Sequence, residues 1–268
     1  MPDNVQTQNV VKDTFDWEVP VEVVPIPSEG KVYPASSSLC NRSTLEIKSM
    51  TAHEEDILAS RALIQKGTVI THLIQSCLVD KDVDVTGMLL GDRNALMVSV
   101  RITGYGSRYN AESTCPECGT KSMQEYNLAD LEIKRLNIEP VIPGDNRFEF
   151  TLPVTGRTVQ FKFLTGADEE ETSITNERKK KLMPGMKVDS AITSKLEQTI
   201  LSIDDVSERN RINQFIKSMP AMDSRQLRSY IENHEPGIDM SVWMKCIDCG
   251  ETSRVSLPIG SNFFWPSQ

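Results

Sequence analysis

The sequence contains three histidines, and none has a cysteine or serine partner at a spacing typical of nucleophilic catalysis. It also lacks a glycine-rich phosphate loop, a Gly-x-Ser-x-Gly elbow and a His-Glu-x-x-His pair. These absences argue against P-loop nucleotide binding, α/β-hydrolase chemistry and zinc-peptidase chemistry. We therefore expect a chain that is not an enzyme and takes no small-molecule substrate.

Long apolar runs are missing as well. No run in the 268 residues approaches the length needed to span a bilayer, and the polar start at residues 1–10 is unlike a signal peptide. We expect no membrane contact and folding in a reducing cytoplasm, where cysteine pairs favour metals over disulfides. A hydrophobic content of 38% is ordinary for a chain with a substantial core.

A basic stripe of the kind that binds phosphate backbones is also missing. The net charge is −9, and the one dense basic run, residues 178–181, follows the acidic run at residues 168–171. Acidic residues first and basic residues last is the order that a helix dipole favours along a solvated helix. The charge pattern therefore predicts a helix here and argues against nucleic-acid binding.

Cysteine is present in two pairs with metal-ligand spacing, Cys115-Pro-Glu-Cys118-Gly and Cys246-Ile-Asp-Cys249-Gly. Each pair is typical of a knuckle, a tight turn that points two thiolates at one centre, and the following glycine lets the backbone turn back. Four thiolates make a closed tetrahedral shell suited to one structural Zn²⁺ per chain. The alternative is two unrelated structural cysteine pairs.

The order of patterns predicts an α+β fold built around a zinc ribbon. We expect strands at 107–114, 122–128, 240–245 and 251–259, so that two hairpins each carry one knuckle. The long segment between the knuckles then has to be an insertion whose ends the metal brings together. The predicted domains are an extended, proline-rich arm at 1–30, a zinc-ribbon parent domain at 31–140 plus 238–268, and an inserted, mainly helical subdomain at 141–237.

Helices are expected on both sides of the first knuckle. In the parent domain, a capping box at Thr51 and Glu54 begins a helix that Gly67 ends, and a second helix covers 69–78. The run 93–103 fits a strand or a helix, and we favour a helix capped by Asp92. In the insertion, a hairpin turns at 155–157, and helices are predicted at 192–203, 212–219 and, capped by Asp223, up to residue 236.

Aromatic residues near both ends are candidate anchors on a partner protein, because buried aromatic side chains often dominate interface energy. These candidates are Phe15, Trp17, Phe263, Phe264 and Trp265. The alternative is that they pack onto the chain itself, the last three as a cap on the apolar face of the zinc ribbon.

Several local motifs together resemble one family. They are Ile26-Pro-Ser-Glu-Gly-Lys-Val-Tyr33-Pro, Met50-Thr-Ala-His-Glu-Glu-Asp-Ile-Leu58, Leu90-Gly-Asp-Arg93, Arg101-Ile-Thr-Gly-Tyr-Gly106-Ser-Arg-Tyr109, the two knuckles and the terminal Phe263-Phe264-Trp265-Pro266. From about residue 26 to its end the chain resembles the T4-type phage baseplate hub assembly proteins, which are hub subunits and hub-assembly factors of tailed bacteriophages. In that family an arginine often follows the paired phenylalanines, where this chain has Trp265.

The resemblance implies a structural or assembly role, including a chaperone-like one, in a contractile-tail baseplate. It implies other tail and baseplate hub proteins as partners, the host cytoplasm as the place of assembly, and the virion as a second location for members that stay in the particle. The alternative from the cysteines alone is a zinc-ribbon adaptor in transcription or DNA processing.

Overall fold

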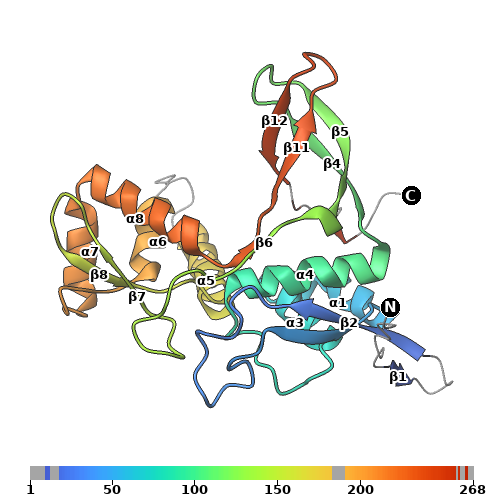
Figure 1. The fold of residues 1–268 in the computed structure, drawn as a ribbon, viewed down its shortest axis with the longest axis horizontal. Coiled ribbons are helices and arrows are strands. Elements are labelled where there is room, and N and C mark those ends of the chain that lie inside the picture. Colours follow the sequence, from blue (N-terminus) through green and yellow to red (C-terminus); the bar gives the residue numbers. More distant parts are fainter. Residues whose placement is uncertain (1–9, 13–17, 183–190, 258, 260–262, 265–268) are drawn as a thin grey trace, which may run out of the picture.

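The computed structural model describes residues 10–12, 18–182, 191–257, 259 and 263–264. It has three parts, which meet at the long helix α4 (Figure 1). We call them the body (β1–β3 and α1–α4), the ribbon (β4, β5, β11 and β12) and the lobe (β7–β9 and α5–α8). The mixed α+β class predicted from the sequence is confirmed.

The body begins with a three-stranded antiparallel sheet in the order β1-β2-β3. Its strands are β1 (Val10–Lys12), β2 (Glu18–Pro25) and β3 (Thr44–Lys48). Val24 at the end of β2 and Ile26 just after it are buried in the core. The arm predicted at 1–30 is therefore extended from Glu18 onward, but this part pairs with β3 and belongs to the body. The prediction missed this because the prolines at 20 and 25 mark an irregular chain, whereas here each lies at the end of a pairing, Pro20 with β1 and Pro25 with β3.

Four helices follow: α1 (Ala52–Ala59), α2 (Arg61–Lys66), α3 (Val69–Cys77) and α4 (Leu90–Tyr105). Glu54 reaches back to the Thr51 amide (2.9 Å) as predicted, and Gly67 ends α2 with a left-handed φ of 72°. The single helix expected from 51 to 67 is wrong, because Ser60 breaks it into α1 and α2. Serine competes for backbone hydrogen bonds and so favours helix ends over helix interiors.

Helix α4 confirms the helical interpretation of 93–103, but its predicted cap is wrong. The helix begins at Leu90 with Leu89 as the capping residue, and Asp92 lies inside the first turn, fully buried. The Asp92 carboxylate accepts hydrogen bonds from the amide and hydroxyl of Ser28 (2.9 and 2.6 Å) and from the Tyr33 hydroxyl (2.5 Å). A short polar side chain before a helix is a capping signal, and a contact 64 residues away cannot be read from local sequence.

The lobe contains a second antiparallel sheet, β7-β8-β9, and four helices. These elements are β7 (Phe148–Thr151), β8 (Thr158–Phe161), α5 (Gly166–Leu182), α6 (Ala191–Thr199), β9 (Ile200–Ile203), α7 (Arg209–Ser218) and α8 (Ala221–His234). The predicted hairpin and the helix over the charged run of residues 168–181 are confirmed.

Two predictions within the lobe are wrong. The helix expected at 192–203 stops at Thr199, and its last apolar residues form β9, which pairs with β8. Ile200 and Ile203 are β-branched and suit a strand as well as a helix, so the pairing with β8 determines the conformation. Asp223 does not cap α8, which begins after Pro220. Its buried carboxylate instead accepts from the Val154 and Thr155 amides in the β7–β8 turn (2.7 and 3.1 Å).

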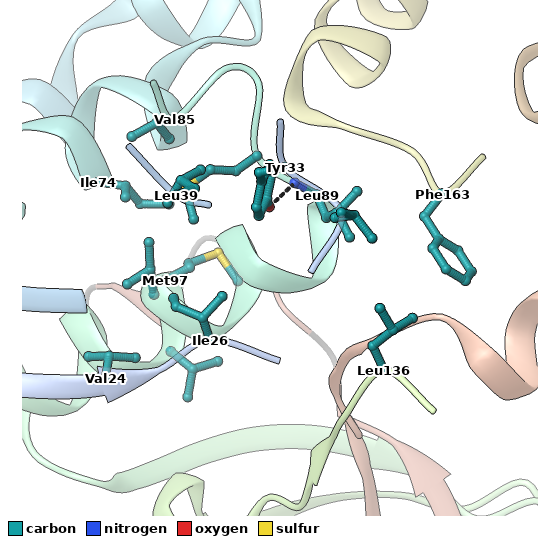
Figure 2. Packing of buried hydrophobic residues seen from close by; sticks show 14 of the residues in the cluster. Val24, Ile26, Tyr33, Leu39, Ile74, Val85, Leu89, Met97, Leu136 and Phe163 are labelled. Carbon is teal, nitrogen blue, oxygen red and sulfur yellow. Dashed lines mark hydrogen bonds between the residues drawn. The ribbon is translucent and has the colours of Figure 1, made fainter. Parts of the chain in front are cut away.

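One continuous hydrophobic core runs through the body and the lobe. Figure 2 shows Leu136 and Phe163 beside the core residues of the body, such as Leu89. At the root of the ribbon, β6 (Ile133–Lys134) pairs with β10 (Gly237–Ile238). This pairing holds residues 133–134 beside 237–238, close to the two ends of the predicted insertion, so backbone hydrogen bonds as well as the four cysteines bring these ends together.

Candidate metal centre

The ribbon consists of two antiparallel hairpins that project from the body beyond α4 (Figure 1). One hairpin joins β4 (Arg108–Thr114) to β5 (Lys121–Asn127), and the other joins β11 (Ser241–Lys245) to β12 (Thr252–Ser256). Buried and exposed residues alternate along β4, which is the pattern of a strand with one covered face. The four predicted strands are confirmed.

The two knuckles have the same backbone geometry. In the first, the Cys115 amide donates to the Thr120 carbonyl (2.9 Å) and the Gly119 amide donates to the Cys115 carbonyl (2.9 Å). The second repeats both bonds from Cys246 and Gly250, at 2.8 and 3.2 Å. Gly119 and Gly250 have φ of 75° and 74°, in the left-handed region where a side chain would be strained. The glycine after each cysteine pair thus has the role expected from the sequence.

The structure brings the four predicted ligands together from opposite ends of the chain. The Sγ atoms of Cys115 and Cys249 are 3.8 Å apart, and those of Cys118 and Cys246 are 3.6 Å apart. All four sulfur atoms lie within 4.8 Å of one another, and none is in a disulfide. A tetrahedron with Zn–S bonds of about 2.3 Å has edges of about 3.8 Å. The cluster therefore fits a structural Zn²⁺, and two unrelated cysteine pairs are no longer a suitable description.

The electrostatics of the cluster also favour a cation. Hydrogen bonds from the hydroxyl and the amide of Thr120 lower the pKa of Cys118 to about 6. The Glu251 amide donates a bond that lowers the pKa of Cys249, but desolvation and the neighbouring sulfur atoms outweigh it and raise that pKa to about 12. Close thiols resist ionising together because their charges repel. A divalent ion at their centre removes this repulsion and holds all four as thiolates.

Polar bonds between the hairpins support the cluster, and sequence reasoning missed them. The Thr120 hydroxyl donates to the Asp248 carboxylate (3.0 Å), linking the residue after one knuckle to the middle of the other. The Gln124 amide nitrogen donates to the Lys245 carbonyl at 3.5 Å. A signal was available, since a threonine directly after Cys-x-x-Cys-Gly has its hydroxyl near the metal side of the turn.

The base of the ribbon shares the main core through buried residues of β4 and β5, whereas its free end has almost no hydrophobic core. Its buried cluster contains Cys115, Met244 and Cys246, with Val255 partly buried against them. Two of the three buried members are thus predicted metal ligands. With so little apolar surface removed from water at the free end, a metal held by the four cysteines would be the main link between the two knuckles.

Two of the predicted anchor residues lie inside the described part of the chain. Phe263 is fully buried and packs edge-on against Tyr109 of β4, with ring centroids 5.4 Å apart, and Phe264 is 6% exposed. Both therefore pack at the base of the ribbon, which fits the alternative that the terminal aromatics cap it and leaves little of either ring for a partner. Phe15, Trp17 and Trp265 lie outside the described residues.

A second group that sequence reasoning missed fixes the base of the ribbon. Arg101 of α4 is fully buried, and its guanidinium donates to the carbonyls of Gly106 (2.6 Å), Arg108 (3.1 Å) and Phe263. One side chain thus joins the body, the first ribbon strand and the C-terminal segment. We therefore expect it to help set the angle at which the ribbon leaves the body.

The family model described as T4 bacteriophage base plate protein matches residues 21–265. The chain belongs to this family. Neither the curated proteins nor the solved structures give a match. Membership confirms the baseplate family expected from the motifs and implies contacts with other baseplate proteins, while the hub assignment stays a prediction. Within the described part of the chain, no helix is long and apolar enough to span a bilayer.

The family motifs meet around α4 of this baseplate protein. Ser28 and Tyr33 of the first motif bind Asp92 of the Gly-Asp-Arg motif. Arg93 donates to Thr71 (3.0 Å) and pairs with Glu169 of the lobe (3.1 Å). The motifs are therefore the contacts that fix the body, ribbon and lobe to one another.

Proposed function

We propose that this baseplate protein is a non-enzymatic hub component or hub-assembly factor that acts through protein–protein contacts, with one Zn²⁺ held by Cys115, Cys118, Cys246 and Cys249. The observation that carries the proposal is the closed four-cysteine cluster at the end of a projecting ribbon. A closed shell offers no open position to water or substrate, so its role is to shape a surface. The family match supplies the setting.

The net charge of −9 supports protein partners over nucleic acid. In this proposal the chain assembles in the host cytoplasm with other hub proteins, and a member that stays bound becomes part of the virion. No step of the role requires catalysis.

The test is binding to the other tail-hub proteins encoded by the same phage. Each is purified and offered singly to the full-length, zinc-loaded chain at physiological ionic strength, and we expect a stable complex with at least one. Parallel infections without this gene should yield baseplates that lack a complete hub in electron micrographs. Normal tails in those infections, with no hub protein bound, contradict the proposal. Retention on duplex DNA that weakens with salt points instead to the zinc-ribbon adaptor.

A further inference from the structure

The ribbon carries the most strongly exposed large apolar side chains of the described part of the molecule. The three most exposed large hydrophobic residues among those described are Ile247 at 76%, Trp243 at 69% and Met123 at 63%. All three lie in the hairpins or knuckles of the ribbon. A contiguous apolar patch marks an interaction surface; these three side chains instead surround one small projecting element.

These three side chains lie on different sides of the ribbon. Met123 of β5 lies between buried Ser122 and half-buried Gln124, so it faces away from the other hairpin. Trp243 of β11 lies between half-buried Val242 and buried Met244 and is likewise on the outer face of its hairpin. Ile247 lies in the second knuckle, at the free end. Apolar surface on two outer faces and on the end cannot be covered by one flat partner surface.

The free end is also acidic. Glu117 and Asp248, at the third position of each Cys-x-x-Cys pair, are exposed, and so is Glu251 just after the second knuckle; they outnumber the exposed Lys121 and Lys245 beside the knuckles. Four thiolates on one Zn²⁺ add about two net negative charges at the same place. A partner that encloses this end needs positive side chains there, because an unpaired buried charge is costly.

We propose that the ribbon inserts end-first into a cleft of a partner hub protein that has apolar walls and basic side chains at its base. The inference rests on the proposed function and names the surface and the partner chemistry. Trp243 and Met123 contact the walls, and Ile247 with Glu117 reaches the base. Arg101 holds the ribbon at the angle required for insertion. A second copy of the same chain is a poor occupant, because two acidic ends repel each other.

The test measures the affinity of the hub protein that binds the full-length, zinc-loaded chain. Trp243→Ser and Ile247→Ser should each raise the dissociation constant by about tenfold or more, as expected for buried apolar anchors. Glu117→Lys should reduce the affinity most at low salt, because salt screens the attraction between Glu117 and the basic side chains of the partner. The matched control is Val154→Ser, which changes an apolar side chain that is 59% exposed on the lobe. Zinc content and circular dichroism confirm that each variant is folded.

Three outcomes overturn the inference. One is a hub protein that binds the wild type and the ribbon variants equally well, which leaves the proposed function intact. Another is an effect confined to Val154→Ser. The last is a concentration-dependent dimer that the ribbon variants abolish, which would make a second copy the occupant. If no hub protein binds the wild type, the proposed function fails and the inference fails with it.

Discussion

The ribbon and the rest of the molecule are stabilised in different ways. The body, the lobe and the base of the ribbon share one large core, whereas the free end of the ribbon has a separate buried cluster of Cys115, Met244 and Cys246. Burial of apolar surface stabilises the first region, and it scales with the number of residues that gather round a core. The free end of the ribbon is too small for this, and a metal held by the four cysteines would replace the missing core. We therefore expect one region of the chain to tolerate loss of zinc and the other to unfold without it.

Loss of a metal ligand should have the largest effect, and it should destabilise the ribbon while the body stays folded. Cys246→Ser removes one of four thiolates, and structural zinc stabilises small domains by on the order of 10 kcal/mol. We expect loss of the bound zinc and rapid amide exchange in β4, β5, β11 and β12, with protection retained in β2 and β3. Hydrogen exchange with mass spectrometry and elemental analysis measure both effects. Cys40→Ser, at a cysteine outside the cluster, is the control. Stoichiometric zinc in Cys246→Ser would show that the cluster is not the metal site.

The second prediction concerns the junction of the three parts. A Cβ at Gly91 of α4 would lie 1.7 Å from the carbonyl oxygen of Pro236, just before β10. Gly91→Ala must therefore push α4 away from the β6–β10 pair, at a cost of about 3 kcal/mol. Gly104→Ala is the control in the same helix, because its Cβ would come no closer than 3.2 Å to the Cβ of Met50, a contact that a shift of a few tenths of an ångström relieves. Thermal unfolding should separate the two variants, and equal melting temperatures would show that this close contact is absent in solution.

Local sequence was sufficient for the ribbon but not for what holds it in place. The spacing of Cys115 and Cys118, repeated at Cys246 and Cys249, predicted the ligands, the turns and the four strands, because a knuckle is a short-range motif with one geometry. Asp92 and Asp223 were expected to be helix caps, and both instead bind distant backbone or side-chain donors. Pairwise contacts of this kind leave no periodic trace in the sequence.

Strand β9 shows the same limit for secondary structure. Residues 192–203 have apolar positions at helical spacing, yet the last four form strand β9, which pairs with β8. Propensity is a weak signal for isoleucine at such a junction, and the neighbouring strand decides the conformation. The family motifs around Ser28, Asp92 and Arg101 could be noticed in the sequence, but their meeting at α4 could not.

The third prediction concerns the link between the body and the ribbon. Arg101→Lys keeps the charge but removes the guanidinium that donates to three carbonyls. We therefore expect the free energy of unfolding to fall by about 2 kcal/mol. The zinc should remain, since no ligand is touched. The distance between labels on the body and on the free end of the ribbon should become broadly distributed in pulsed electron spin resonance. Arg108→Lys is the control, because this exposed residue contributes only its backbone carbonyl. A narrow distance distribution in Arg101→Lys would mean that other contacts set the ribbon angle.

The smallest effect concerns a buried carboxylate of the body. Burial raises the pKa of Glu54, but hydrogen bonds from Ser76 and Thr51 and the charge of Lys48 outweigh it and lower the pKa from 4.5 to about 2. Because the folded pKa is below the unfolded value, this contribution to stability is present above about pH 4.5 and is lost as the pH falls towards 2. Glu54→Gln should lower the free energy of unfolding by about 1 kcal/mol at neutral pH. It should also make that free energy less dependent on pH between about 4.5 and 2.

The zinc ribbon complicates acid titration, because protonation of cysteine thiolates releases the metal. The measurement is therefore denaturant unfolding followed through the helices of the body, at pH 7 and at steps between pH 5 and pH 3. Asp56→Asn, at an exposed position two residues further along α1, is the control. If the unfolding free energy of Glu54→Gln changes with pH as steeply as that of the wild type, the carboxylate does not stabilise the body. The apolar core alone then accounts for the difference in stability between the body and the ribbon.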